Sequence, residues 1–527
     1  MADLTQTLEA PHEGKNASGQ SHLGWALVLI CIAQLMVVLD STIANIALPF
    51  IQKDLAFTPE NLTWVITAYA LCFGGFLLLG GRLGDLYGRR RVFMIGLVIF
   101  AVASFMGGFA QNEAMILGSR GLQGLGAALA SPAALALIAT TFPAGPQRNR
   151  AFGVYAAISG VGAAIGLILG GWLTGIDLNL LGLDVHGWRL TFLINTPIGL
   201  AAALLAPMLL AESDTHAGEL DVPGAITGTA GLLGIVYGLT HAATHGWGNT
   251  TTITSLVMGG ALLALFLVIE SRVEHPLMPF RVFDNRTRAV SFVAMMIVPA
   301  AMFAMFFYLS QYMQNVMHYS PLKTGVSFLP FPFGIVISAT IGSRLISKVD
   351  PRFLAGAGTL MAGAALFGFS RIPYDTVAPA TYVHASYATQ LMPFIVLMAL
   401  GMGLVFVPLT LTAVHHLRPE ETGIGSGVLN AMQQVGGALG LSILSTVAAH
   451  VMTGSRADLG VPKGAPDVTK WSPDQLLGFQ QVFAHGSTVA FIVGSAMILT
   501  ASAIVWLFLD VKHTELATDG PEAVHVG

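Results

Sequence analysis

Two charged side chains lie deep inside long apolar runs of this sequence, and they point most directly to chemistry. Asp40 lies in the run centred near residue 34, and Arg120 in the run centred near residue 127. A charge in such a run is costly, so it marks a functional site by default. Desolvation favours the protonated form of a carboxyl group, whereas a nearby cation favours the ionised form. The pair therefore predicts a proton-coupling site; the alternatives are a fixed structural ion pair and a bond from Asp40 to Thr42.

Other polar side chains in the apolar runs are uncharged amides. Each must find a partner or line a wet cavity, because an unsatisfied polar group is expensive in apolar surroundings. The candidates for lining a substrate cavity are Gln34, Asn45, Gln123, Asn195, Gln311, Gln314, Asn430, Gln433 and Gln434. Phe307 joins them from the aromatic and Met-rich segment 303–308, for which packing and lipid contact are the alternatives. Amides beside apolar rings suit an amphipathic organic ligand rather than a sugar or an ion.

A short basic stretch rich in glycine, residues 80–91, separates two of the apolar runs. It holds four of the 24 Lys and Arg residues, and its site candidates are Gly81, Arg82, Gly84, Asp85, Gly88, Arg89 and Arg90. The composition predicts a tight loop between two spanning helices, kept in the cytoplasm by its arginines. We hypothesise that Asp85 pairs with a nearby arginine or a helix N-terminus. That contact would latch a cytoplasmic gate when a central cavity faces outward.

Glycines repeat at helical spacing in the fifth apolar run. Gly162, Gly166 and Gly170 are four residues apart and share one helix face, and Gly171 follows them. Small residues let a neighbouring helix approach closely within a membrane. The pattern predicts a groove in which a second helix packs and slides or bends, and fixed packing is the alternative.

The composition identifies the surroundings in which these residues work. Hydrophobic residues make up 54% of the 527 and charged residues only 10%, whereas a soluble domain carries about 25% charged residues. The chain is therefore predicted to be an all-α integral membrane protein in contact with the lipid bilayer. The net charge of −4 gives no case for nucleic acid. Cys31 and Cys72 lie in apolar runs and suggest neither a disulfide nor a metal site.

The apolar runs predict about 14 membrane-spanning helices, since each run has the length of about 20 residues that a span needs. Of the Lys and Arg residues outside the spans, 16 fall in segments on the side of the N-terminus and 7 in segments on the other side. Positively charged loops stay in the cytoplasm. Both termini are therefore expected in the cytoplasm, with the protein in the inner (cytoplasmic) membrane.

An internal repeat divides the chain. The basic stretch has a partial copy at 344–352, offset by 262 residues, in which Ser347 replaces Asp85. The glycine pattern of 153–166 recurs at 427–440, offset by 274 residues. The matched helices run in the same direction, which is typical of transporters whose halves rock about a central site. The predicted division is a tail at 1–22, a six-helix half at 23–212, an inserted helix pair at 213–275, a six-helix half at 276–510 and a tail at 511–527.

These motifs together resemble the major facilitator superfamily, and specifically its fourteen-helix drug:proton antiporters. Residues 80–91 look like the family's cytoplasmic signature, and Asp40 lies in what looks like its first-helix signature. Arg120, Gln123 and Gly124 match the motif that the family links to proton transfer. Gly162, Gly166, Gly170 and Gly171 match its antiporter motif, with Leu167 where the family usually has proline. The match runs from about residue 25 to about residue 510.

The resemblance implies a proton-coupled exporter of drug-like or antibiotic molecules that works by alternating access. The substrate would be an amphipathic small molecule, the proton gradient would supply the energy, and no cofactor is expected. No phosphate-binding loop occurs in the sequence, which argues against direct ATP coupling. We expect the protein to function as a monomer. A periplasmic adaptor is possible, but nothing in the sequence supports one. Two alternatives remain: an importer or a metabolite exporter on the same fold, and a membrane enzyme or receptor, for which no catalytic arrangement appears.

Overall fold

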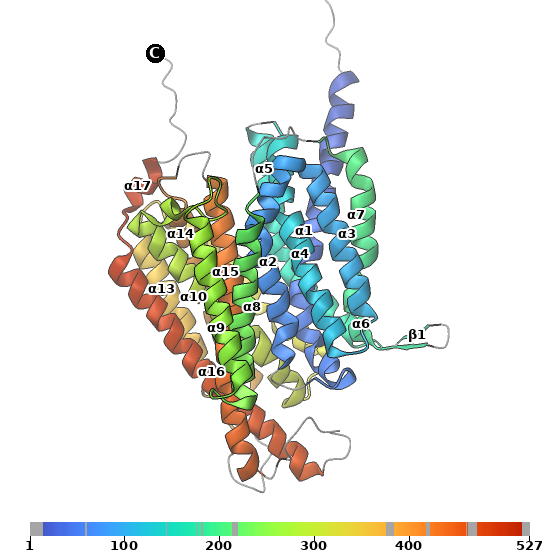
Figure 1. The fold of residues 1–527 in the computed structure, drawn as a ribbon, viewed down its shortest axis with the longest axis vertical. Helices are drawn as coiled ribbons and strands as arrows, with labels where there is room; N and C mark the ends of the chain where they lie inside the picture. The colour runs from blue at the N-terminus through green and yellow to red at the C-terminus, as the bar shows by residue number, and fades with distance from the viewer. Residues whose placement is uncertain are drawn as a thin grey trace, which may run out of the picture.

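The computed structural model shows an almost entirely helical protein (Figure 1). It describes residues 14–57, 61–143, 145–176, 178–180, 183–212, 220–375, 384–417, 422–459, 461 and 472–518. The two long loops expected around residues 371–387 and 451–484 lie partly outside the described residues. The ends of the two tails, 1–13 and 519–527, also lie outside them.

The described part of the N-terminal half contains seven α-helices. Their bounds are α1 Gly14–Asp54, α2 Trp64–Tyr87, α3 Arg89–Gly108, α4 Glu113–Thr141, α5 Pro146–Thr174, α6 Gly187–Leu193 and α7 Asn195–Leu209. A short 3-10 helix, η1 Asn61–Thr63, precedes α2. A hairpin of two short antiparallel strands, β1 Leu178–Leu180 and β2 Leu183–Val185, precedes α6. Helices α6 and α7 follow each other directly and form the sixth span, Gly187–Leu209.

The rest of the chain continues with the inserted pair, α8 Val222–His245 and α9 Thr250–Glu270. The C-terminal half then comprises η2 Phe280–Phe283, α10 Arg286–Asn315, α11 Pro321–Ser327, α12 Pro330–Leu345, α13 Pro351–Phe369, η3 Tyr387–Leu391, α14 Met392–Ala413, α15 Thr422–Asp458, α16 Pro473–Phe508 and α17 His513–Thr518. Among the described residues, 13 helices are long and apolar enough to span a membrane, and Val161–Thr174 of α5 is a shorter apolar helix. This is in line with the expected 14 spans.

The two halves use the same helix pairs. In the first half α2 and α3 pack on α4, α1 packs on α5, and α3 packs on α7. In the second half α12 and α13 pack on α14, α10 packs on α15, and α13 packs on α16. Helix α10 therefore corresponds to α1, and α15 to α5. The structure agrees with a parallel repeat, and Figure 1 shows the halves side by side with α8 and α9 in front of the junction.

The halves meet along two seams. Helix α2 packs on α15 at one seam, and α5 packs on α11 and α12 at the other. Helix α8 packs on both α2 and α15, whereas α9 packs mainly on α8. The start of α1 and the end of α17 lie on the same side of the bundle (Figure 1). We call this the terminal side and the opposite one the far side.

Glycines set the close approach of the helices that carry the charged pair. A Cβ atom on Gly126 of α4 would lie 2.7 Å from the backbone nitrogen of Phe100 in α3. A Cβ atom on Gly124 would contact the backbone carbonyl of Tyr69 in α2. Because both contacts are with main-chain atoms, larger residues could not be accommodated by a side-chain shift. The two glycines hold α4 tightly between α2 and α3, which fixes the position of Arg120 one turn away.

Candidate functional site

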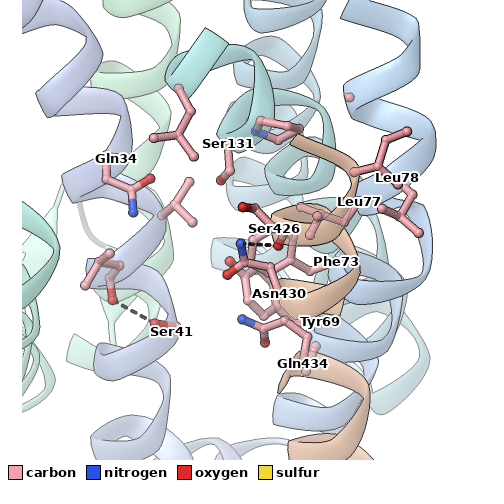
Figure 2. Close-up of a pocket in the computed structure, with 18 of the residues that line it drawn as sticks. Gln34, Ser41, Tyr69, Phe73, Leu77, Leu78, Ser131, Ser426, Asn430 and Gln434 are labelled. Atoms are coloured by element: carbon pink, nitrogen blue, oxygen red, sulfur yellow. Dashed lines mark hydrogen bonds between the residues drawn. The ribbon is translucent and has the colours of Figure 1, made fainter. Parts of the chain in front are cut away.

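A central cavity of about 1780 Å³ lies between the halves. Helices α1, α2, α4 and α5 of the first half contribute to its wall, as do α10, α12 and α15 of the second. Figure 2 shows Gln34 and Ser41 on one side of this space, with Asn430 and Gln434 on the other. The wall extends to Arg82 and Arg89 in α2 and α3 and to exposed residues of the 271–285 linker, such as Glu274. The cavity therefore opens toward the terminal side.

The far end of the cavity is closed by contacts between α1 and α10. Ser310 donates a hydrogen bond of 2.9 Å to the backbone carbonyl of Asn45. Gln314 donates one of 3.1 Å to the carbonyl of Ile46. Both α10 side chains are at least nine-tenths buried. We call these two hydrogen bonds and the α5–α11 contact the far seal.

Backbone-to-backbone packing completes the far seal where α5 meets α11. A Cβ atom on Gly171 would lie 2.6 Å from the carbonyl oxygen of Pro321. A Cβ atom on Gly325 would contact the carbonyl oxygen of Leu167. The seal therefore depends on glycine at both positions, because no side chain can move aside to relieve these contacts.

Asp40 and Arg120 form a buried ion pair near the closed end of the cavity. The Arg120 Nη1 atom lies 2.6 Å from Asp40 Oδ2. The two residues are 3% and 0% exposed, so bulk water screens this pair very little. The two charges that the sequence predicted to act together are thus in direct contact.

Neighbouring helices supply further hydrogen bonds to this pair. Gln123 donates to Asp40 Oδ1 at 2.9 Å and accepts from Arg120 at 2.9 Å. Asn195, the first residue of α7, also donates to Asp40 Oδ1, at 3.1 Å. Ser104 of α3 contacts Gln123, and the carbonyl of Val65 in α2 accepts from Arg120 Nε. We call these residues the Asp40 network; all of them belong to the N-terminal half.

Tyr69 connects the Asp40 network to the cavity. The Arg120 guanidinium lies 4.5 Å from the centre of the Tyr69 ring, and both residues line the cavity. The Tyr69 hydroxyl is buried and has no hydrogen-bond partner among the described residues. The Asn195 Oδ1 atom is likewise buried and accepts no hydrogen bond from a described residue. The network is therefore a polar site with spare hydrogen-bonding capacity that faces the cavity.

The ten predicted cavity residues, nine amides and Phe307, fall into two groups. Gln34, Asn45, Asn430 and Gln434 line the cavity, and their contact with a substrate stays a prediction. The expectation is corrected for six candidates that do not line it: Gln123, Asn195, Phe307, Gln311, Gln314 and Gln433. Gln123 and Asn195 bind Asp40 instead, and Gln314 belongs to the far seal.

The remaining three point away from the cavity because of their position around their helices. Phe307 and Gln311 line a separate small space that they share with α15 and α16. Gln433 is half-buried and lies one residue, or about 100° around α15, from the cavity-lining Gln434.

The basic stretch 80–91 lies at the open mouth of the cavity. Gly81, Arg82, Asp85 and Arg89 line the mouth. Asp85 pairs with Arg89 of its own half, with 3.2 Å between Arg89 Nη2 and Asp85 Oδ1. The latch between halves that we expect from Asp85 belongs to the opposite state, in which the terminal side is closed. It therefore stays a prediction.

Glu212, beyond the end of α7, is a partner that the sequence did not indicate. Its carboxylate accepts a 3.0 Å hydrogen bond from the backbone nitrogen of Arg90. The Arg90 Nε and Arg91 Nε atoms lie 3.5 and 3.7 Å from it. Gly88 reaches this corner with a φ of 100°, and a Cβ atom there would collide with the Glu212 carboxylate. The carbonyl oxygen of Gly84, one turn earlier in α2, accepts a hydrogen bond from the Gly88 backbone nitrogen.

Helix α5 packs its glycine face against α1. Cβ atoms on Gly162, Gly166 and Gly170 would contact Leu35, Thr42 and Ile43 respectively. The close approach predicted from the spacing is present, and the approached helix is the one that carries Asp40. Gly171 faces α11 instead. Whether the two helices slide stays a prediction.

Comparison with known proteins identifies the family. Residues 30–441 match the family model described as the Major Facilitator Superfamily. The chain belongs to the Major Facilitator Superfamily. It is therefore a multi-pass membrane transporter of small molecules and not an enzyme. Among the described residues no group of three or more His, Cys, Asp or Glu side chains could hold a metal ion.

Several curated relatives of this superfamily chain are named for antibiotic resistance or export. It is 39% identical to the puromycin resistance protein of Streptomyces alboniger over 498 residues, which is 94% of this chain and 93% of that protein. It is 35% identical to the cephamycin export protein of Amycolatopsis lactamdurans over 439 residues, or 82% of this chain and 87% of that one. The family predicted from the motifs is thereby confirmed.

Solved structures agree with the fold. A bacterial homolog of the human lysosomal transporter Spinster, solved in an inward-facing and unoccupied conformation, matches with a TM-score of 0.68 and 15% identity. The match covers 94% of this superfamily chain and 98% of that one.

Proposed function

We propose that this superfamily member exports drug-like or antibiotic amphipathic small molecules in exchange for protons. The observation that carries the proposal is a buried carboxylate, Asp40, in a polar network at the closed end of a large, largely apolar cavity. Relatives named for puromycin resistance and cephamycin export support the substrate class. The terminal side is the cytoplasm and the membrane is the inner membrane, in keeping with the Lys and Arg bias of the loops.

The two seams support alternating access. In this structure the cavity opens to the terminal side, and the far seal closes the other end. Rocking of one half against the other would open the far seal and close the mouth at the basic stretch. The substrate would bind from the cytoplasm or the inner leaflet and leave on the far side.

Protonation of Asp40 would loosen α1 from its own half. The ion pair with Arg120 and the hydrogen bonds from Gln123 and Asn195 join α1 to α4 and α7. A neutral Asp40 attracts the Arg120 guanidinium less strongly than a carboxylate does. The far seal also involves α1, at Asn45 and Ile46. Protonation of Asp40 would therefore weaken the far seal through movement of α1.

The test is transport by purified protein in sealed liposomes with an imposed pH gradient. A labelled amphipathic compound is expected to move against its own gradient only while the pH gradient exists. Persistent concentrative transport after an ionophore collapses the gradient would contradict proton coupling. The direction separates export from the alternative of import, because expression in cells should lower accumulation of the compound.

Asn430 offers a test of the cavity as the substrate site. Its side chain is exposed to the cavity and, among the described residues, donates only to the Ser426 carbonyl in its own helix. Asn430→Leu should therefore leave folding intact and weaken binding of a substrate that hydrogen-bonds there by about tenfold. The measurement is the substrate KM in liposomes, with Thr254→Val on the exposed face of α9 as the control. An unchanged KM for every compound tested would remove Asn430 from the site.

Asp85→Asn tests the proposed latch. The substitution removes the charge that Asp85 would offer to a partner when the terminal side closes. We expect a severalfold slower transport cycle with little change in substrate affinity, because Asp85 is far from the closed end of the cavity. Glu515→Gln in α17 is a control carboxyl on the same side of the protein. A normal transport rate in Asp85→Asn would count against the latch.

A further inference from the structure

A second pair of buried carboxyl groups lies outside the Asp40 network, where the inserted helices meet the linker to α10. Asp221 precedes α8 and Glu270 ends α9, and each is 3% exposed. The two side chains lie within hydrogen-bonding reach of each other. No motif or repeat of the sequence involves either residue.

A backbone nitrogen donates to one oxygen of each carboxyl group, and the other oxygen of each group has no described hydrogen-bond donor. Asp221 Oδ1 accepts a 2.7 Å hydrogen bond from the Gly224 nitrogen. Glu270 Oε2 accepts one of 2.9 Å from the Met278 nitrogen. The other oxygens, Asp221 Oδ2 and Glu270 Oε1, are buried and receive no hydrogen bond from any described donor. Both acceptors therefore lack a hydrogen atom, and one proton between them would satisfy both.

No cation compensates this pair among the described groups that face it. On the linker, Arg272, Glu274 and His275 are all exposed. Arg82 and Asp85 of α2 and Arg281 of the linker line the mouth of the cavity, and Asp221 itself lies one residue before α8. Leu277 packs with Leu79 of α2 and Ala225 of α8 and so shields the carboxyl pair with apolar side chains. Two ionised carboxylates in such a position repel each other strongly.

We propose that Asp221 and Glu270 form a second proton-binding site, and that its proton holds the 271–285 linker in place at the mouth of the cavity. Glu270 anchors the linker through Met278, and Glu270, Glu274 and Arg281 all line the cavity. Loss of the shared proton leaves two carboxylates in contact. Glu270 then turns toward the water of the cavity and releases Met278, and the linker detaches from α2 and α8. The site is independent of Asp40 and controls access rather than coupling.

The experiment measures the linker and not transport. In protein lacking Cys31 and Cys72, Leu277→Cys, whose side chain is buried while the linker is in place, is labelled with a thiol reagent in lipid nanodiscs from about pH 5 to about pH 9. Rates are corrected for ionisation of the thiol with a cysteine at exposed Thr254. The corrected rate is expected to rise by about fivefold or more as the pair loses its proton. A corrected rate that does not change with pH overturns the proposal.

Two isosteric variants identify the site. In Glu270→Gln the amide donates to Asp221 and still accepts from Met278, so the linker should stay attached at every pH. Asp221→Asn should act in the same way from the other side, while it keeps the bond from Gly224. Glu274→Gln is the matched control on the same linker and should retain the wild-type pH profile. A wild-type profile in both Glu270→Gln and Asp221→Asn overturns the proposal.

Two further arms distinguish the shared proton from a bound metal cation and from the titration of Asp40. Repeating the pH series with sodium replaced by a bulky organic cation should change nothing, and a profile that depends on sodium would overturn the proton site in favour of a metal cation. The profile should also persist in an Asp40→Asn background. Loss of the profile there would mean that the linker reports on Asp40, which overturns the second site but leaves the proposed proton-coupled export standing.

Discussion

Asp40→Asn is expected to abolish proton-driven transport while leaving a folded, membrane-inserted protein. Asparagine keeps the shape of the side chain and can still accept from Arg120, but it cannot take up or release a proton. Removal of a group that must transfer a proton reduces rates by about two orders of magnitude or more. The measurement is concentrative transport in liposomes with a pH gradient, together with substrate binding at fixed pH. Binding should survive, because Asp40 itself does not line the cavity.

The controls for this variant address the buried charge that it leaves behind. Breaking a buried ion pair from one side costs about 3–5 kcal/mol of stability. The double variant Asp40→Asn with Arg120→Gln removes both charges, so it should recover thermal stability without recovering coupling. Asp54→Asn removes a different carboxylate–arginine contact, that of Asp54 with Arg189 at 2.9 Å, and should keep gradient-driven transport. Full coupled transport by Asp40→Asn would show that the buried pair is structural.

Gly325→Ala is expected to hold the protein open on the far side. The added Cβ atom would meet the Leu167 carbonyl oxygen, which cannot move without moving α5. Overpacking of this kind costs about 1–3 kcal/mol. Because the cost falls only on the state in which the far seal is closed, it shifts the balance between the two states by about 5- to 150-fold. Transport should fall because the cycle must pass through the disfavoured state.

A cysteine in the far seal measures this shift. In protein lacking Cys31 and Cys72, Ser310→Cys is buried against α1 while the seal is closed. Gly325→Ala should raise its reactivity toward a membrane-impermeant reagent added on the far side. Gly153→Ala is the control, since a Cβ atom at this position in α5 has open space around it. If Ser310→Cys is labelled as slowly in Gly325→Ala as in the protein that keeps Gly325, a steric role for Gly325 is contradicted.

Sequence alone revealed the features that depend on residue types and their spacing along the chain. Apolar runs of spanning length gave the helices, and the offset copies of two motifs gave the repeat that the helix pairing reproduces. Asp40 and Arg120 stood out because each is a charge within an apolar run. Their direct contact, across 80 positions of the chain, joins the two charges that the sequence assigned to one proton-coupling site.

Other parts of the site depend on rotation about a helix axis, which the sequence does not fix. Gln433 and Gln434 are adjacent and chemically identical, yet only Gln434 lines the cavity. Gln123 and Asn195 carry the right chemistry but bond to Asp40 rather than to a ligand. The spacing of three between Arg120 and Gln123 places both on one helix face, which was the signal that Gln123 could bind the charged pair.

Acidic residues at helix ends were missed for a different reason. Glu212, Asp221 and Glu270 all stand where an apolar run gives way to polar loop, a place where a solvated carboxyl is ordinary. Only the folded chain shows that Glu212 binds Arg90 and that Asp221 and Glu270 are buried together. Burial of a helix end depends on what packs over it, here the linker residue Leu277.

The composition of the Asp40 network has an electrical consequence. Because Arg120 balances Asp40 within 2.6 Å, the proton-free site is neutral overall, and the protonated site carries one positive charge. Each unit charge that crosses a potential of 100 mV exchanges about 2.3 kcal/mol with the membrane. An uncharged cargo traded for one proton would therefore generate a current, whereas a monovalent cation traded for one proton would not. Recordings on a solid-supported membrane would count the charges moved per cycle and so show whether the cargo is uncharged or a monovalent cation.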